Sequence, residues 1–186
     1  YEKCFADYGY LVAQILLTRD DFSQRERYLN FRNTLSAVLK YGAVPIINEN
    51  DTVAFEEIKF GDNDTLAAMM AGALGADLLI LLSDVDGLYS ANPQKDPQAV
   101  KIAMVPEVNE SIMALAGEAG SKFGSGGMIT KITAASIASS QGVPMILAHG
   151  QTEDVLLKIC QGQPLGTLFL AKENPMDGKK GWLAFG

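Results

Sequence analysis

The stretch that decides the fold is Leu78-Leu79-Ile80-Leu81-Leu82-Ser83-Asp84. Its first five positions are all apolar, as expected for a β-strand that is covered on both faces. Strands of this kind occur in parallel sheets that lie between two layers of helices, and ligands bind beyond the carboxyl ends of such strands. The sequence therefore predicts an α/β fold, a three-layer αβα sandwich with a largely parallel central sheet.

Strand-like and helix-like segments alternate on either side of this stretch, which supports the α/β class. Gly75 and Gly142 fall where a left-handed residue would end a helix, and Asp64 and Thr65 are expected to cap the helix that follows them. No internal repeat or linker-like run divides the chain. The predicted strands are 10–17, 43–47, 78–82, 101–105, 144–148 and 167–170, and the predicted helices are 24–40, 64–74, 108–116, 128–141 and 153–160.

The composition of the 186 residues fits one domain with a sizeable core. The formal net charge of −7 argues against nucleic acid or an anionic membrane as a partner, because both are bound through clustered Lys and Arg. Cys4 and Cys160 lack a metal-ligand spacing and are expected to be partly buried thiols in a reducing cytoplasm. The single histidine, His149, follows an apolar run, where a structural role is expected.

Two polar motifs flank one predicted transition from strand to helix. Asn48-Glu49-Asn50-Asp51 follows a strand and could hydrogen-bond a small zwitterion, or it could be an ordinary polar turn. Gly61-Asp62-Asn63-Asp64 precedes a helix and could hold an ammonium group or a lysine, or approach magnesium, or it could be only a capping turn. Their closeness in the sequence favours a shared binding site.

Two further motifs lie at the end of a predicted strand and at the start of a predicted helix. Ser83 and Asp84 follow the buried strand, and Asp84-x-Asp86-Gly87 resembles the start of an EF-hand loop. The required Glu is missing and a strand precedes the motif, so no metal site is assigned. Gly124-Ser125-Gly126-Gly127-Met128-Ile129-Thr130-Lys131 leads into a helix; its glycines would let the backbone approach a phosphate, although a flexible surface loop is the alternative.

In order and spacing these four motifs resemble those of the amino acid kinase family, and within it the enzymes that phosphorylate glutamate. The resemblance covers essentially the whole chain. Ser83 stands where a threonine is expected, which keeps the hydroxyl. The phrases that carry the resemblance are Pro45-x-Ile47-Asn48-Glu49-Asn50-Asp51, Gly61-Asp62-Asn63-Asp64, Leu82-Ser83-Asp84 and Gly126-Gly127-Met128-x-Thr130-Lys131.

The resemblance implies ATP-dependent phosphorylation of the glutamate γ-carboxylate to γ-glutamyl phosphate, the first step of proline biosynthesis, with Mg²⁺ accompanying ATP. It implies that Asp64 and Lys131 are catalytic, Asp64 as the aspartate that organises the lysines. It places L-glutamate against Asp51, Asn63, Asn48, Asn50 and Asp62. It places ATP against Ser83, Asp84, Ser125, Gly126, Gly127, Met128, Ile129, Thr130 and Lys131.

The resemblance also implies a cytoplasmic homo-oligomer, a dimer or tetramer, that passes its product to glutamyl phosphate reductase. Residues 1–186 would then be an amino acid kinase domain without the family's N-terminal strand and phosphate loop, and without the RNA-binding-type C-terminal domain of many relatives. Two other hypotheses stay open: a non-catalytic module that senses an amino acid through the same pocket, and a kinase of the same fold with aspartate or acetylglutamate as acceptor.

Overall fold

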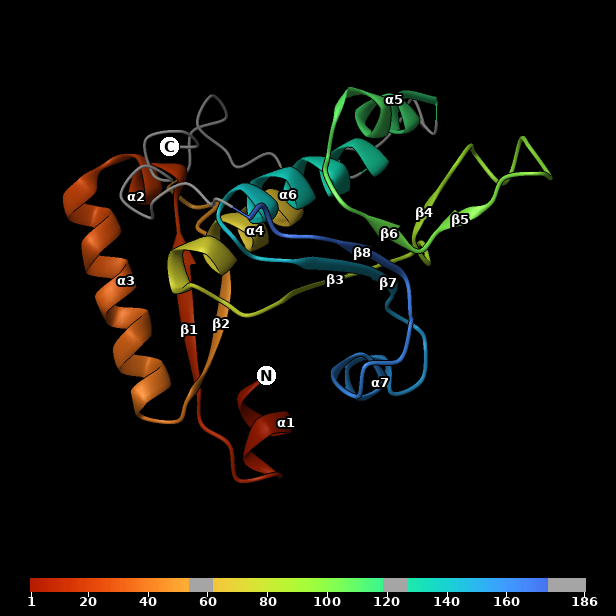
Figure 1. The fold of residues 1–186 in the computed structure, drawn as a ribbon. Helices are drawn as coiled ribbons and strands as arrows, with labels where there is room; N and C mark the ends of the chain where they lie inside the picture. The colour runs from red at the N-terminus through yellow and green to blue at the C-terminus, as the bar shows by residue number, and fades with distance from the viewer. Residues whose placement is uncertain (54–61, 119–126, 174–186) are drawn as a thin grey trace.

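The computed structural model describes residues 1–53, 62–118 and 127–173, in which helices and strands alternate along the chain (Figure 1). The helices are α1 (Glu2–Ala6), α2 (Arg19–Ser23), α3 (Arg25–Lys40), α4 (Asn63–Leu74), α5 (Glu110–Glu118), α6 (Met128–Ser140) and α7 (Val155–Cys160). The strands are β1 (Val12–Leu17), β2 (Val44–Glu49), β3 (Leu79–Ser83), β4 (Leu88–Tyr89), β5 (Lys101–Ile102), β6 (Met104–Val105), β7 (Met145–His149) and β8 (Thr167–Phe169).

β3 packs against neighbours on both faces, as its apolar sequence predicts, although Leu82 near its end is 44% exposed. β3 runs parallel to β7, with Leu81 opposite Leu147, and both of these side chains are buried in the main core. Ile80, the next residue along β3, packs on the other side in a small cluster with Val155 and Ile159 of α7. In Figure 1, α4 and α6 lie on one side of these strands and α7 lies on the other. The three-layer prediction is confirmed here.

The strand pairing is mostly parallel, with two antiparallel exceptions. β1 pairs with β2, β3 with β7, and β6 with β8, all in parallel. β7 and β8 are antiparallel in the four-stranded sheet of order β3-β7-β8-β6, and β4 and β5 form a separate antiparallel pair. The prediction of a largely parallel fold therefore holds for the strands that follow the long helices.

One predicted strand is wrong in extent. Residues 101–105 were expected to form a single strand, but they form β5 and β6, which have different partners. Ile102 pairs with Leu88 of β4, whereas Val105 pairs with Phe169 of β8. A lysine followed by four apolar residues does not reveal that the backbone changes partner in the middle of the segment. β4 and α2 were not predicted at all, since each is too short to show a period.

The ends of α4 show both a correct and an incorrect prediction. Gly75 ends the helix in the left-handed conformation, at φ 61°, as expected. The N-terminal cap is Asp62 rather than Asp64 or Thr65, because the Asp62 carboxylate accepts a hydrogen bond from the backbone N–H of Thr65 at 2.6 Å. A capping side chain bonds the N–H group two or three residues ahead of it. With Asp62 as the cap, α4 begins at Asn63, one residue earlier than predicted.

The surface differs from expectation at the two thiols. Cys4 and Cys160 were expected to be partly buried, but both are exposed and free. Each lies on a helix of five or six residues, α1 or α7, that is too short to bury every face. None of the described helices is both long and apolar enough to cross a bilayer.

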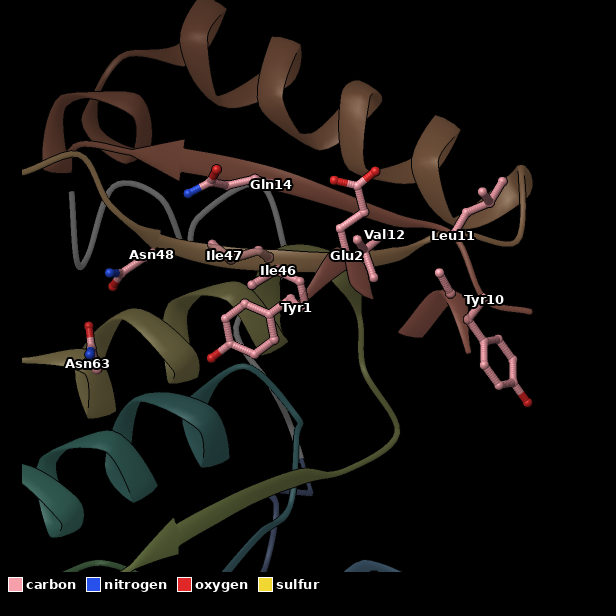
Figure 2. Close-up of a pocket in the computed structure, with 11 residues that line it drawn as sticks. Tyr1, Glu2, Tyr10, Leu11, Val12, Gln14, Ile46, Ile47, Asn48 and Asn63 are labelled. Carbon is pink, nitrogen blue, oxygen red and sulfur yellow. The ribbon is translucent and has the colours of Figure 1, made fainter. Parts of the chain in front are cut away.

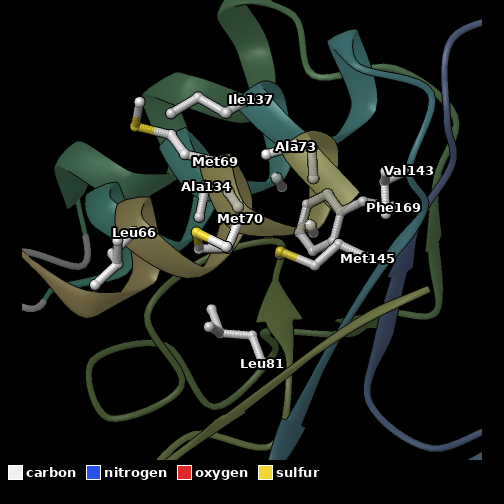
Figure 3. Packing of buried hydrophobic residues seen from close by; sticks show 14 of the residues in the cluster. Leu66, Met69, Met70, Ala73, Leu81, Ala134, Ile137, Val143, Met145 and Phe169 are labelled. Carbon is white, nitrogen blue, oxygen red and sulfur yellow. The ribbon is translucent and has the colours of Figure 1, made fainter. Parts of the chain in front are cut away.

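The main core lies between α4, α6 and the four-stranded sheet (Figure 3). Ala68, Ala134, Ala135 and Ala138 have no solvent-exposed surface, and side chains this small let two helices approach closely. Larger side chains complete the cluster around the helix pair; Met70, Met145 and Phe169 lie on the side of the helices that faces Leu81 of β3, and Met69 and Ile137 lie farther from that strand. The close packing of α4 on α6 sets the relative position of the residues at their N-termini.

The turn before β8 lies close to β7, and substitutions in it test this close approach. Gly166 has φ +74°, and a Cβ added there would overlap the carbonyl oxygen of Leu147. Gly162 has a similar φ of +78° but open space around it. We expect Gly166→Ala to lower the free energy of unfolding by about 3 kcal/mol, the sum of left-handed strain and overpacking. Gly162→Ala should lower it by about 1 kcal/mol, from backbone strain alone.

Urea denaturation of the two variants measures both free energies. Equal losses of stability would contradict the close approach of Gly166 to β7.

Candidate functional site

A carboxylate and an ammonium group meet between the first turns of α4 and α6. Asp64 Oδ2 lies 3.1 Å from Lys131 Nζ, and the side chains are 18% and 9% exposed, respectively. A lysine this deeply buried needs a negative partner, because an unpaired buried charge costs several kcal/mol. The two residues are 67 positions apart in sequence, so helix packing alone brings them together.

The two helices lie side by side in the same direction. Their first turns meet at Asp64 and Lys131, and near their ends Gly72 approaches Gln141 so closely that a Cβ on Gly72 would overlap the Gln141 side chain. Both N-termini are therefore at the same end of the pair. The first N–H groups of a helix lack partners within it and carry partial positive charge. Two such ends beside a lysine create a region that favours an anion.

The carboxyl end of β3 contributes a second acidic group, Asp84. The Ser83 hydroxyl donates a hydrogen bond to Asp84 Oδ1 at 2.9 Å. This bond, more than any other influence, holds the pKa of Asp84 below its ordinary value of 3.8, and the Asp84 backbone N–H and the charges of Lys131 and His149 act in the same direction. Asp84 thus experiences the positive charge of Lys131, although its main partner is Ser83.

His149, for which the sequence predicted only a structural role, lies next to this region. It ends β7, directly opposite Ser83 in the parallel register of β3 and β7. Its Nδ1 accepts a hydrogen bond from the backbone N–H of Gln151 at 3.1 Å, which fixes the orientation of the ring. The available signal was positional, since parallel neighbours end at the same sheet edge and a polar residue ending the next strand therefore lies beside Ser83.

A cavity of about 680 Å³ lies along β2, and two of the predicted substrate residues line it (Figure 2). Asn48 of β2 and Asn63 of α4 lie at the same end of this cavity and come from different elements. Asn63 directly precedes Asp64, so this end of the cavity adjoins the ion pair. Gln14 of β1 also lines the cavity and was not predicted. Three amide side chains can both donate and accept hydrogen bonds, which suits a zwitterionic ligand.

The other predicted substrate residues have local roles among the described residues. Asn50 Oδ1 accepts a hydrogen bond from the Thr52 hydroxyl at 2.6 Å, and Asp51 is exposed in the turn that follows β2. Asp62 caps α4 with both carboxylate oxygens, through the backbone and hydroxyl of Thr65. Contact of these three residues with a substrate stays a prediction.

The glycine-rich motif is described only in its second half. Ser125 and Gly126 lie outside the described residues. Gly127 is the N-cap of α6, Met128 packs against the main core and Ile129 is exposed. Thr130 faces α4, where its hydroxyl lies 2.8 Å from Asp64 Oδ2. The predicted nucleotide loop and the predicted catalytic aspartate are thus in direct contact.

The hydrogen bond between Ser83 and Asp84 can be tested by titration. We expect Ser83→Ala to raise the pKa of Asp84 toward 3.8, and Ser83→Thr to keep it low because the hydroxyl remains. Because folding lowers this pKa, its stabilising contribution is complete above 3.8 and is lost as the pH falls through the lowered value. Carbon-13 NMR of the Asp84 carboxyl group measures the shift, and an unchanged pKa in Ser83→Ala would refute this assignment.

Solved structures with the same fold include two kinases. UMP kinase from Ureaplasma parvum matches with a TM-score of 0.62 and 10% identity, over 91% of this chain and 64% of that one. Carbamate kinase from Giardia lamblia, bound to AMP-PNP, matches with a TM-score of 0.55 and 18% identity, over 76% of this chain and 44% of that one. At these identities the likeness establishes the fold alone.

Relatives with similar sequences are named glutamate 5-kinase. The one from Caldanaerobacter subterraneus subsp. tengcongensis is 52% identical over all of this chain and 50% of its own length. The one from Clostridium acetobutylicum is 54% identical over 92% of this chain and 64% of its own length. The chain thus spans about half to two thirds of these relatives. The profile of the amino acid kinase family matches residues 1–149, and this chain belongs to that family.

Proposed function

We propose that the protein transfers the γ-phosphoryl group of ATP to the side-chain carboxylate of L-glutamate, forming γ-glutamyl phosphate for proline biosynthesis. The observation that carries this proposal is the buried Asp64–Lys131 pair at the joined N-termini of α4 and α6. Relatives at 52% and 54% identity that are named glutamate 5-kinase support the choice of acceptor.

The reaction needs alignment and charge neutralisation more than acid–base chemistry. A carboxylate is already ionised at neutral pH, so no base has to remove a proton from it. A glutamate oxygen forms a bond to the γ-phosphorus while the bond from that phosphorus to the bridging oxygen breaks, and ADP leaves with the bonding electrons. Four anionic groups converge in this step, namely the glutamate carboxylate and the three phosphate groups of ATP. Positive charge must therefore be fixed in place before the reaction.

Lys131 would supply that charge. Its ammonium group has three N–H donors, and the Asp64 carboxylate holds one side of it at 3.1 Å. In the complex, this ammonium group would also donate to the transferring phosphoryl group. Because Asp64 fixes the lysine before ATP arrives, little reorganisation is needed during the reaction. The positive ends of α4 and α6 add to the same stabilisation.

Glutamate would occupy the Asn48–Asn63 end of the cavity along β2. The two amide groups could bind its carboxylate and ammonium groups. Asp51 would pair with the α-ammonium, and Asn50 and Asp62 would complete the acceptor site. Asn63 directly precedes Asp64, so a substrate at this end would have its γ-carboxylate near the Asp64–Lys131 pair.

ATP would bind beyond the carboxyl end of β3, where Ser83 and Asp84 lie, and would contact residues 125–131 up to the first turn of α6. Mg²⁺ takes carboxylate and phosphate oxygens as ligands and usually keeps several waters. The carboxylate of Asp84 is exposed and ionised at neutral pH, and it fits that donor chemistry. When bound, the ion would neutralise phosphate charge.

We further propose that the enzyme is a cytoplasmic homo-oligomer that passes its product to a reductase. The product is an acyl phosphate, which water hydrolyses readily, so prompt transfer to the next enzyme would protect it.

An amino-acid sensor and a kinase with another acceptor are the competing functions. The cavity and its amides would serve either one, but a sensor does not require a lysine paired with an aspartate beside it. Incubating the complete gene product with MgATP and glutamate, aspartate or acetylglutamate in turn separates the three functions. We expect ADP formation with glutamate; ADP formation only with another acid, or none with any, would refute the proposal.

Substitutions at the two proposed subsites should affect different kinetic parameters. We expect Asp64→Ala to abolish turnover, and the isosteric Asp64→Asn to lower kcat by about 100-fold or more, because the buried Lys131 loses its charged partner. Asp51→Ala should instead raise the KM for glutamate about 10-fold or more at nearly unchanged kcat, as expected for lost substrate binding. Steady-state kinetics with glutamate varied measures both effects.

Thermal unfolding of each variant is the control for folding. Equal effects of Asp64→Asn and Asp51→Ala on kcat and KM would contradict the assigned roles.

A further inference from the structure

The hydroxyl of Thr130 lies between two acceptors. Its Oγ1 is 2.8 Å from Asp64 Oδ2 on α4 and 2.8 Å from the carbonyl oxygen of Gly127 on its own helix. A hydroxyl has one proton and can donate it to one of them at a time. A hydrogen bond to an ionised carboxylate is about twice as strong as one to a neutral carbonyl. The proton of Thr130 therefore belongs to Asp64 whenever that carboxylate is charged.

Two neighbouring residues of α6 donate to the same carboxylate oxygen. Lys131 Nζ lies 3.1 Å from Asp64 Oδ2, the oxygen that also accepts from Thr130. The lysine side chain is long and has many rotamers, whereas threonine is branched at Cβ and has few in a helix. Of the two donors, Thr130 is thus the rigid one, and it connects Asp64 directly to the α6 backbone.

We propose that Thr130 is a positioning residue for phosphoryl transfer. Its hydroxyl holds the Asp64 carboxylate in the orientation in which that carboxylate directs the Lys131 ammonium group to the transferring phosphoryl group. This inference rests on the proposed kinase function and deepens it. It also differs from the contact with ATP that the sequence resemblance implied for Thr130.

The Thr130 hydroxyl has only one proton, and this distinguishes a positioning role from a contact with ATP. ATP phosphates are ionised and bind through donors. Because Thr130 gives its only proton to Asp64, it has none left for a phosphate oxygen. Loss of the hydroxyl should therefore slow the chemical step rather than weaken ATP binding.

Thr130→Val is the direct test, because it keeps the branched shape and removes only the hydroxyl. An error of about 1 Å in the placement of a catalytic group can cost about 100-fold in rate. We expect kcat of the complete gene product to fall about 10- to 100-fold, with the KM values for ATP and glutamate changing less than about threefold. Thr130→Ser, which retains the donor, should recover most of the lost activity.

Thr133→Val is the matched control on the same helix. The Thr133 hydroxyl donates to the carbonyl oxygen of Ile129 at 2.8 Å, one turn back on α6, and is not part of the site. We expect this variant to keep kcat and both KM values close to those of the wild type. Melting temperatures of all three variants show whether any change in activity follows from unfolding.

Each other outcome has a definite meaning. A raised KM for ATP at unchanged kcat in Thr130→Val would make Thr130 a nucleotide contact and overturn the positioning role. Equal losses in Thr130→Ser and Thr130→Val, or no loss in either, would overturn it as well. If the wild-type protein forms no ADP in response to glutamate, the proposed function and the positioning role are both overturned. If the wild type is active and Thr130→Val has the same kcat and KM values, only the positioning role is overturned.

Discussion

The close packing of α4 against α6 is the constraint on which the candidate site depends. Four alanines without exposed surface, Ala68, Ala134, Ala135 and Ala138, allow the two helices to lie in contact and in the same direction. Larger side chains at these positions would move the helices apart and separate Asp64 from Lys131. A structural feature of the core thus determines the geometry of a polar site at its edge, because both residues lie in first turns that the packing fixes.

The Asp64–Lys131 ion pair is largely buried and is stabilised by the neighbouring Thr130 hydroxyl. Burial raises the energy of a lone lysine, so the Lys131 ammonium group needs the Asp64 carboxylate, and the carboxylate is in turn held by the Thr130 hydroxyl. The cavity along β2 approaches this pair from one side through Asn63. The end of β3 approaches it electrostatically through Asp84. Acceptor and nucleotide would therefore meet at the point where the two helices begin.

The sequence predicted those parts of the fold whose local pattern matches their final environment. The continuous apolar run 78–82 indicated a strand with two covered faces, and Ile80 and Leu81 do pack on opposite sides. Asp64 and Lys131 were both predicted to be catalytic from the resemblance to a family, but nothing in their spacing of 67 residues indicates that they are in contact. The division of 101–105 between two sheets and the antiparallel β8 depend on tertiary pairing that no local pattern records. His149 and Gln14 were missed for the same reason, because register with a neighbouring strand or position along a cavity decides where each of them lies.

The proposed mechanism requires Lys131 and Asp64 to form the centre of phosphoryl transfer. A crystal structure of the complete gene product with glutamate and a non-hydrolysable ATP analogue tests this most directly. The mechanism predicts that Lys131 Nζ lies within hydrogen-bonding distance of the γ-phosphate and keeps its contact with Asp64. It also predicts that glutamate lies at the Asn48–Asn63 end of the cavity. A γ-phosphate bound away from Lys131, or a lysine that leaves Asp64 and turns from the nucleotide, would contradict it.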